Sequence, residues 1–217
     1  MIKKKSIIIA ASIACFIGCI GDFWVTFVLA DYKPGYSHLR HTMSMLGVEN
    51  SPVSLLISAW WITLGFLIIF FALGFAEAFN YRRWEVKFST WLLILYGLGE
   101  GLGSGLFKAE RINNSLTITG NLHEIMGAFG TIAILILPLF MMRIILRSVN
   151  PSFHTLSWTV LIIGLSMLIL FLFRFSSFEI EGLSLYKGLW QRLFVLDYYI
   201  YLIVIAVMMI KRQQVSS

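Results

Sequence analysis

The side chains best able to do chemistry in this sequence are ionisable groups that interrupt long apolar stretches. Such groups are costly to bury at membrane depth, and they usually face a bundle interior or a water-filled cavity. A pocket formed by them would bind or move a lipid headgroup or a small polar solute, or would activate water through a carboxylate or an imidazole. The alternative is that they pair with one another or reach the membrane surface. The candidate pocket residues are Asp22, Glu100, His123, Glu124, Arg192 and Asp197.

A polar loop, residues 31–52, precedes the second apolar stretch and adds Ser44 to the pocket candidates. A Pro-Gly pair in this loop predicts a turn, and Ser37 can cap a helix. We therefore expect a short interfacial or re-entrant helix over residues 37–46 that lies across the pocket on the outer side of the membrane.

Two histidines of this loop, His38 and His41, are spaced to lie on one face of the expected helix. Imidazole nitrogens together with a carboxylate form a ligand set that zinc prefers. With His123 as a third nitrogen ligand, the loop predicts a zinc site as an alternative to exposed, solvated histidines.

Six apolar stretches are each long enough to cross a hydrocarbon core of about 30 Å. No stretch between them is long enough to form a soluble domain, so residues 1–217 are expected to form one integral membrane domain. The predicted fold is all-α, a bundle of six transmembrane helices. The expected spans are 6–30, 53–80, 88–107, 118–145, 154–173 and 188–210.

Composition favours the same fold class. Of 217 residues, 59% are hydrophobic and 13% are charged, whereas soluble domains have about 45–50% and about 25%. A single soluble core would not bury that much apolar surface. The first stretch, after residues 3–5, also has the flanks of a signal peptide, but its apolar run of about 25 residues exceeds the usual 7–15.

The basic residues indicate orientation in the cell membrane. Three lysines precede the first span, and with a cytoplasmic N-terminus the inner segments hold ten of the 17 Lys and Arg residues and the outer segments seven. Both termini are therefore predicted to be cytoplasmic. The net charge of +6 is scattered, which excludes a basic groove for nucleic acid and leaves the lipid bilayer as the expected partner.

Glycines recur in the third apolar stretch. Gly97, Gly101 and Gly105 repeat every four residues and predict a small-residue face for close helix packing. We expect Gly101 to be in contact with a neighbouring helix, and Gly99, on another face, to tolerate substitution better than Gly101.

The run YSHLRHTMSMLG at residues 36–47, followed by a long apolar helix, resembles the domain of unknown function 998 family of prokaryotic multi-pass membrane proteins. His123 early in the fourth stretch and GLWQR at residues 188–192 fit the same layout. This chain has Met45 where the family pattern is commonly acidic. The resemblance implies a membrane protein and brings no assigned reaction.

A more distant likeness is to membrane hydrolases of the alkaline-ceramidase type, which combine a serine, an aspartate and three histidines around zinc. That likeness implies a zinc-dependent lipid hydrolase as an alternative function. Those enzymes carry paired histidines near the C-terminal end, and here no histidine follows residue 154. A structural membrane subunit without its own ligand is a third hypothesis. The residues that match by type are Ser44, Asp22, His38, His41 and His123.

Overall fold

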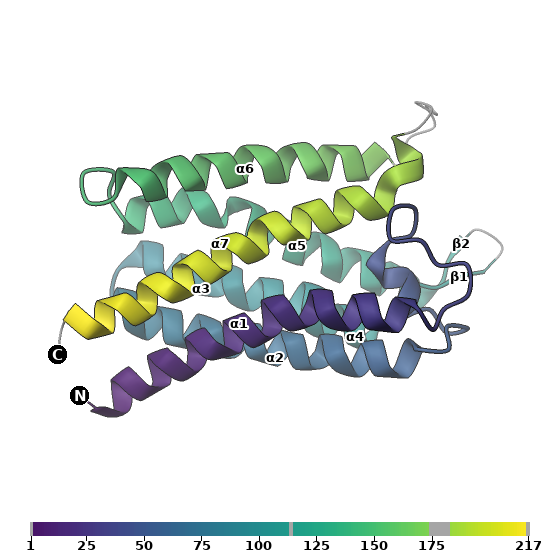
Figure 1. Cartoon of the computed structure of the whole chain (residues 1–217), viewed down its shortest axis with the longest axis horizontal. Coiled ribbons are helices and arrows are strands. Elements are labelled where there is room, and N and C mark those ends of the chain that lie inside the picture. Colours follow the sequence, from purple (N-terminus) through teal and green to yellow (C-terminus); the bar gives the residue numbers. More distant parts are fainter. Residues whose placement is uncertain (1, 113–114, 174–182, 216–217) are drawn as a thin grey trace.

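The computed structural model describes residues 2–112, 115–173 and 183–215, and these form an all-helical bundle (Figure 1). A two-stranded antiparallel hairpin, β1 (Arg111–Ile112) and β2 (Ser115–Leu116), is a small addition to it. The 3-10 helices are η1 (Met43–Leu46) and η4 (Ser184–Tyr186), and a π-helix is η2 (Gly97–Gly103). The α-helices are α1 (Ile2–Ala30), α2 (Ser54–Phe79), α3 (Trp84–Tyr96), α4 (Ser104–Leu106), α5 (Ile118–Ile144), α6 (Pro151–Leu172) and α7 (Lys187–Val215).

Long apolar sequences become helices here because a backbone in lipid must satisfy its own hydrogen bonds. Polar caps set where two of them begin. Thr117 accepts a hydrogen bond from the Gly120 amide at the start of α5. Asn150 does the same for the Phe153 amide, with proline in the first turn of α6. Helix α6 therefore begins three residues before the predicted span of 154–173.

Within the described residues, five helices are long and apolar enough to cross a membrane: α1, α2, α5, α6 and α7. Their outward faces are apolar, with Leu55 81% and Ile162 61% exposed, as expected of helices that contact lipid. The predicted span 88–107 is not among the five. It corresponds to α3, η2 and α4, which follow one another over residues 84–106 and are divided by the π-helix.

The helices lie along one long axis, and both termini are at the same end of the bundle (Figure 1). Helix α7 crosses between α1 and α6, whereas α2 packs on α1, and α5 packs on α3 and α6. We call the end that carries residues 31–53 and the β hairpin the loop end, and the opposite end the terminal end. Fully buried apolar side chains such as Phe75, Met141 and Met209 fill the terminal half.

Residues 37–46 do not form the expected single helix. The amide of His41 closes one turn on the Ser37 carbonyl at 2.8 Å. Thr42 is then extended, and η1 follows as a separate 3-10 turn. The turn at Ser37 to His41 docks on α7, and this contact with a neighbouring helix replaces continuation of the local helix.

The glycines of η2 face two helices, not one. A Cβ on Gly101 would lie 2.3 Å from the Gly65 Cα of α2. A Cβ on Gly99 would lie 2.3 Å from the Met126 carbonyl oxygen and 2.8 Å from the Gly130 nitrogen of α5. The expectation that Gly99 tolerates substitution better than Gly101 is therefore wrong. The glycines at four-residue spacing, Gly97, Gly101 and Gly105, share the face that packs on α2, whereas Gly99 and Gly103 form a second close contact, with α5.

Replacing either Gly99 or Gly101 by alanine should destabilise the bundle by roughly 1–3 kcal/mol, because each added methyl group would meet backbone atoms of a neighbouring helix. Gly127→Ala is the matched control, since its Cβ would meet only Glu100 Oε1, at 3.8 Å. Thermal unfolding in detergent measures the difference. A Gly99→Ala variant as stable as Gly127→Ala would contradict the two-sided packing.

Candidate functional site

Asp22 joins three helices through one buried carboxylate. Its side chain is 2% exposed. The Trp60 indole of α2 donates to Oδ1 at 2.9 Å, and the Tyr199 hydroxyl of α7 donates to Oδ2 at 2.9 Å. Tyr96, 4% exposed, lies close to Tyr199.

Gly21 allows this arrangement. A Cβ at Gly21 would lie 2.5 Å from the Trp60 ring, so only a residue without a side chain lets the indole lie across α1 and reach Asp22. Hydrogen bonds donated by Trp60 and Tyr199 stabilise the ionised carboxylate.

Glu100 lies on the π-helix, between the glycines that contact α2 and α5. Its Oε1 accepts a hydrogen bond from the Thr131 hydroxyl of α5 at 2.6 Å. A single π turn within a helix frequently marks a functional site, because it displaces a side chain from the regular helical face. Close packing by Gly99 and Gly130 brings the Glu100 backbone against α5.

His123 lies in the second turn of α5 and is 8% exposed. Its Nδ1 lies 2.9 Å from the Phe107 carbonyl oxygen, and a carbonyl can only accept, so Nδ1 carries the proton. In the neutral ring Nε2 then bears the lone pair. Such a backbone contact fixes the ring orientation as well as the tautomer.

These three side chains line one small cavity in the loop half of the bundle, the inner cavity, of about 50 Å³. Its wall toward the loop end includes Ser44 and Gln191, whose Oε1 accepts from the Met43 amide at 2.7 Å. The lining residues are Asp22, Met43, Ser44, Trp61, Leu64, Tyr96, Glu100, Ser104, His123, Gln191, Val195 and Tyr199.

A second, wider cavity of about 700 Å³, the outer cavity, lies at the loop end. Ser44 of η1 lines both cavities, so the two cavities meet at this residue. Glu124 lines the outer cavity together with Glu49 and Glu110. The pKa of Glu110 is raised, first by its hydrogen bond to the Glu49 carboxyl and then by burial and the Glu49 charge. The remaining lining residues are Thr42, Met45, Val48, Asn50, Ala109, Arg111, Ile112 and Lys187.

Arg192 holds the loop and does not line either cavity. Its guanidinium donates to the carbonyl oxygens of His38, His41 and Gly188 at 2.6, 3.0 and 2.9 Å, and to the Tyr36 hydroxyl at 2.6 Å. The absence of a side chain at Gly188 allows the loop carbonyls this close to α7, because a Cβ there would lie 2.3 Å from the His41 oxygen.

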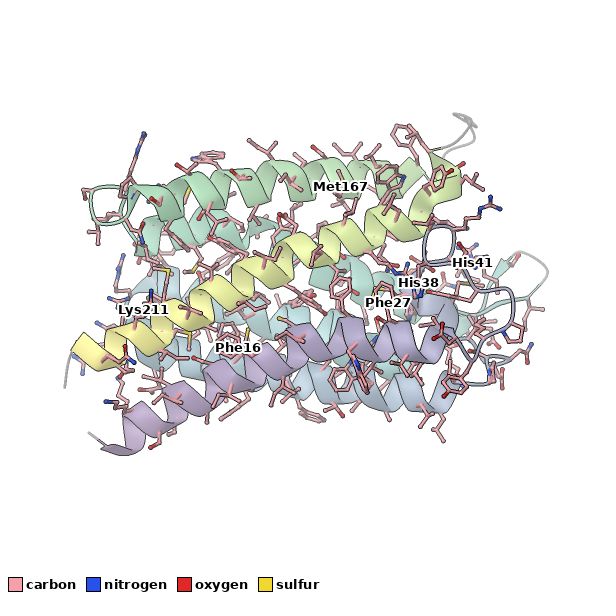
Figure 2. All side chains as sticks on the ribbon, viewed as in Figure 1. Phe16, Phe27, His38, His41, Met167 and Lys211 are labelled. Atoms are coloured by element: carbon pink, nitrogen blue, oxygen red, sulfur yellow. The ribbon has the colours of Figure 1, made fainter. Side chains whose placement is uncertain are left out.

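His38 and His41 lie at the loop end beside Phe27 (Figure 2). His38 stacks on Phe27 with ring centroids 4.2 Å apart, and His41 Nδ1 accepts from the Ser37 amide at 3.0 Å. Burial, followed by the Arg192 charge, lowers the pKa of His38. Burial, followed by the Lys187 charge, lowers that of His41. Neither ring lines a cavity with His123.

No group of three or more His, Cys, Asp or Glu residues that could hold a metal occurs in the part of the chain that the structure describes. Asp197, half-buried on α7, lines neither cavity. Its Oδ2 is buried and has no hydrogen-bond partner within 2–112, 115–173 and 183–215.

Sequence reasoning missed the partners of the carboxylates. Trp60 and Tyr199 lie in apolar stretches, where aromatic residues are normally interpreted as packing or interfacial groups. Gln191 could have been identified as a site residue, because it is next to Arg192 in the GLWQR run.

The fold and these buried polar groups define a multi-pass membrane protein with a polar interior in one half of its bundle. The chain belongs to the family described as protein of unknown function (DUF998), whose sequence profile matches residues 17–208. This confirms the resemblance seen in the sequence. The chain matches none of the curated proteins and none of the solved structures with which it was compared.

Arg192→Met should loosen residues 36–46 and destabilise the protein by roughly 2–4 kcal/mol, because buried carbonyl oxygens lose a charged donor. Hydrogen exchange in lipid nanodiscs should show faster exchange of this segment, with the terminal half unchanged. Lys187→Met is the control, since it removes a positive charge from the same helix without touching these carbonyls. Unchanged exchange in Arg192→Met would contradict the clamp.

Proposed function

We propose that this protein binds, and in its cycle moves, a small polar solute or a lipid headgroup in the inner cavity. The observation that carries the proposal is the pair of cavities with Ser44 in the wall of both. The inner cavity offers Asp22, Glu100 and His123 among helices that otherwise bury apolar side chains. Polar groups at such depth typically mark a substrate or ion pathway.

The outer cavity supports a role in access. Its volume, about 700 Å³, lies within the range of about 300–1,000 Å³ that small-molecule sites occupy. It is at the loop end, where a solute or a headgroup would arrive from the membrane surface. Ser44 of η1 lines both cavities, so a shift of Ser44 and its neighbours would join the two.

We further propose that the chain crosses the cell membrane six times with both termini in the cytoplasm. The helical run over residues 84–106 would add one crossing to those of the five long apolar helices. At a rise of about 1.5 Å per residue, it is long enough to span the hydrocarbon core. Support comes from the shared end of the two termini (Figure 1) and from Lys211, which lies at that end (Figure 2). The loop end would then face outward.

Reporter fusions test this placement. Fusions after residues 84 and 149 should be active on the cytoplasmic side, and fusions after residues 48 and 112 on the external side, because basic residues favour the cytoplasmic segments. The opposite result at two of the four positions would overturn the orientation.

Chemical access to the inner cavity tests the proposed function. In a background in which Cys15 and Cys19 are alanine, Ser104→Cys should react with methyl methanethiosulfonate in nanodiscs, because residue 104 lines the inner cavity. Ser89→Cys is the matched control, since Ser89 is 0% exposed and lines neither cavity. Mass spectrometry measures the rate for each.

We expect Ser104→Cys to react at least about 10 times faster than Ser89→Cys, as for a site that opens to solvent on a slow timescale. A rate equal to that of the control would contradict a ligand cavity. It would favour the third hypothesis, a structural membrane subunit, which has its own support: Trp60 and Tyr199 already supply both carboxylate oxygens of Asp22 with donors.

A further inference from the structure

We propose that a groove between the start of α6 and the end of α7 binds one anionic glycerophospholipid, with an acyl chain along its apolar wall and the phosphate at Lys211. The groove has a volume of about 320 Å³. It lies at the terminal end, whereas the inner cavity lies in the loop half (Figure 1). The inference therefore goes beyond the proposed function and does not depend on it.

The groove forms because α6 and α7 pack closely over only part of their length. A Cβ on Gly164 of α6 would lie 2.5 Å from the Tyr198 ring of α7. Ser157 Oγ lies 2.8 Å from the Tyr201 hydroxyl, and Phe153 stacks on the Tyr201 ring with centroids 5.6 Å apart. Past these contacts α7 runs obliquely away from α6 toward the terminal end (Figure 1). The groove is the space that opens between the two helices there.

The wall of the groove is apolar. Leu156 of α6 lines it together with Ile203, Val204, Val207 and Met208 of α7. An empty apolar space deprives its lining atoms of dispersion contacts, and water is not held where polar partners are lacking. From residue 203 to residue 211 the groove follows α7 for about 12 Å, at about 1.5 Å per residue. An acyl chain is the apolar molecule that a bilayer supplies along such a length.

Lys211 supplies a positive charge at the end of the groove that is nearest the membrane surface. Its side chain is exposed, lines the groove and lies at the terminal end (Figure 2). Acyl chains alone give little selectivity, because lipid tails are as apolar as the side chains they contact. A lysine near the membrane surface attracts anionic headgroups. Asn150 and Ser152 line the same end and carry N–H and O–H donors suited to phosphate oxygens.

The charges near the groove favour an anionic headgroup over a zwitterionic one. Among the described residues, none that lines the groove is acidic. Two carboxylates of the terminal end, Glu77 and Glu85, lie 3.0 Å from Lys4 and 3.5 Å from Arg83. A headgroup such as phosphatidylcholine would bring a second cation toward Lys211, and like charges repel. Phosphatidylglycerol brings only the phosphate.

A fluorescent reporter in the groove tests the inference. In the background in which Cys15 and Cys19 are alanine, bimane is attached to Val207→Cys, which lines the groove. The matched position is Ile200→Cys, which is 49% exposed and lies two turns away on the same face of α7. Nanodiscs contain phosphatidylcholine and phosphatidylglycerol in equal amounts, and one lipid at a time has brominated acyl chains, which quench bimane on contact. The quenching gives the relative occupancy of each lipid at the reporter.

We expect phosphatidylglycerol to be favoured about fivefold over phosphatidylcholine at residue 207, which corresponds to about 1 kcal/mol from one lysine. At residue 200 the two lipids should quench about equally. Lys211→Gln should lower the ratio at residue 207 to that at residue 200. Lys5→Gln is the control, since it removes a lysine of the same end that does not line the groove, and it should leave the ratio unchanged.

Equal ratios at residues 207 and 200 would overturn the inference, and so would a ratio at residue 207 that survives Lys211→Gln. A third outcome is that neither lipid quenches at residue 207 while both quench at residue 200. Protein, such as a second copy of the chain, would then cover the groove, and the lipid assignment would be wrong.

Discussion

The buried carboxylate of Asp22 is the constraint on which the polar half of the bundle depends. An anion that is 2% exposed must receive hydrogen bonds from its surroundings, and its donors come from two other helices. Trp60 reaches it across Gly21, and Tyr199 reaches it from α7. The positions of α1, α2 and α7 relative to one another are thereby coupled to a single side chain. These same helices supply much of the inner cavity wall.

The bundle is divided along its length. In the terminal half, side chains such as Phe75 and Met141 pack as an ordinary apolar core. In the loop half, the π-helix places Glu100 against α5, and Arg192 draws the loop carbonyls onto α7. The loop then covers the inner cavity through η1. The residues that hold the loop in place thus differ from those that make the inner cavity polar. The loop could therefore move without loss of the polar groups in the cavity.

Sequence reasoning predicted the helical membrane fold, the family and the approximate ends of most helices, because long apolar runs and their polar caps are local signals. That Asp22, Glu100 and His123 come together was also readable, since helices of similar length bring similar positions to similar heights along the bundle. The hydrogen-bond acceptors of Arg192 could not be predicted from the sequence, because they are mainly backbone carbonyls, which every residue has. The π-helix that divides the third apolar stretch was equally hidden, and so was the close contact of Gly99 with α5.

The central claim, that the inner cavity is a ligand site, is tested most directly by an experimental structure of the protein purified into nanodiscs made from its native membrane lipids. The account predicts density that is not protein between Asp22, Glu100 and His123, with its nearest atom within about 3.2 Å of a carboxylate oxygen, as for a hydrogen bond. A cavity closed by its own side chains, with Asp22 and Glu100 bonded only to protein groups, would contradict it.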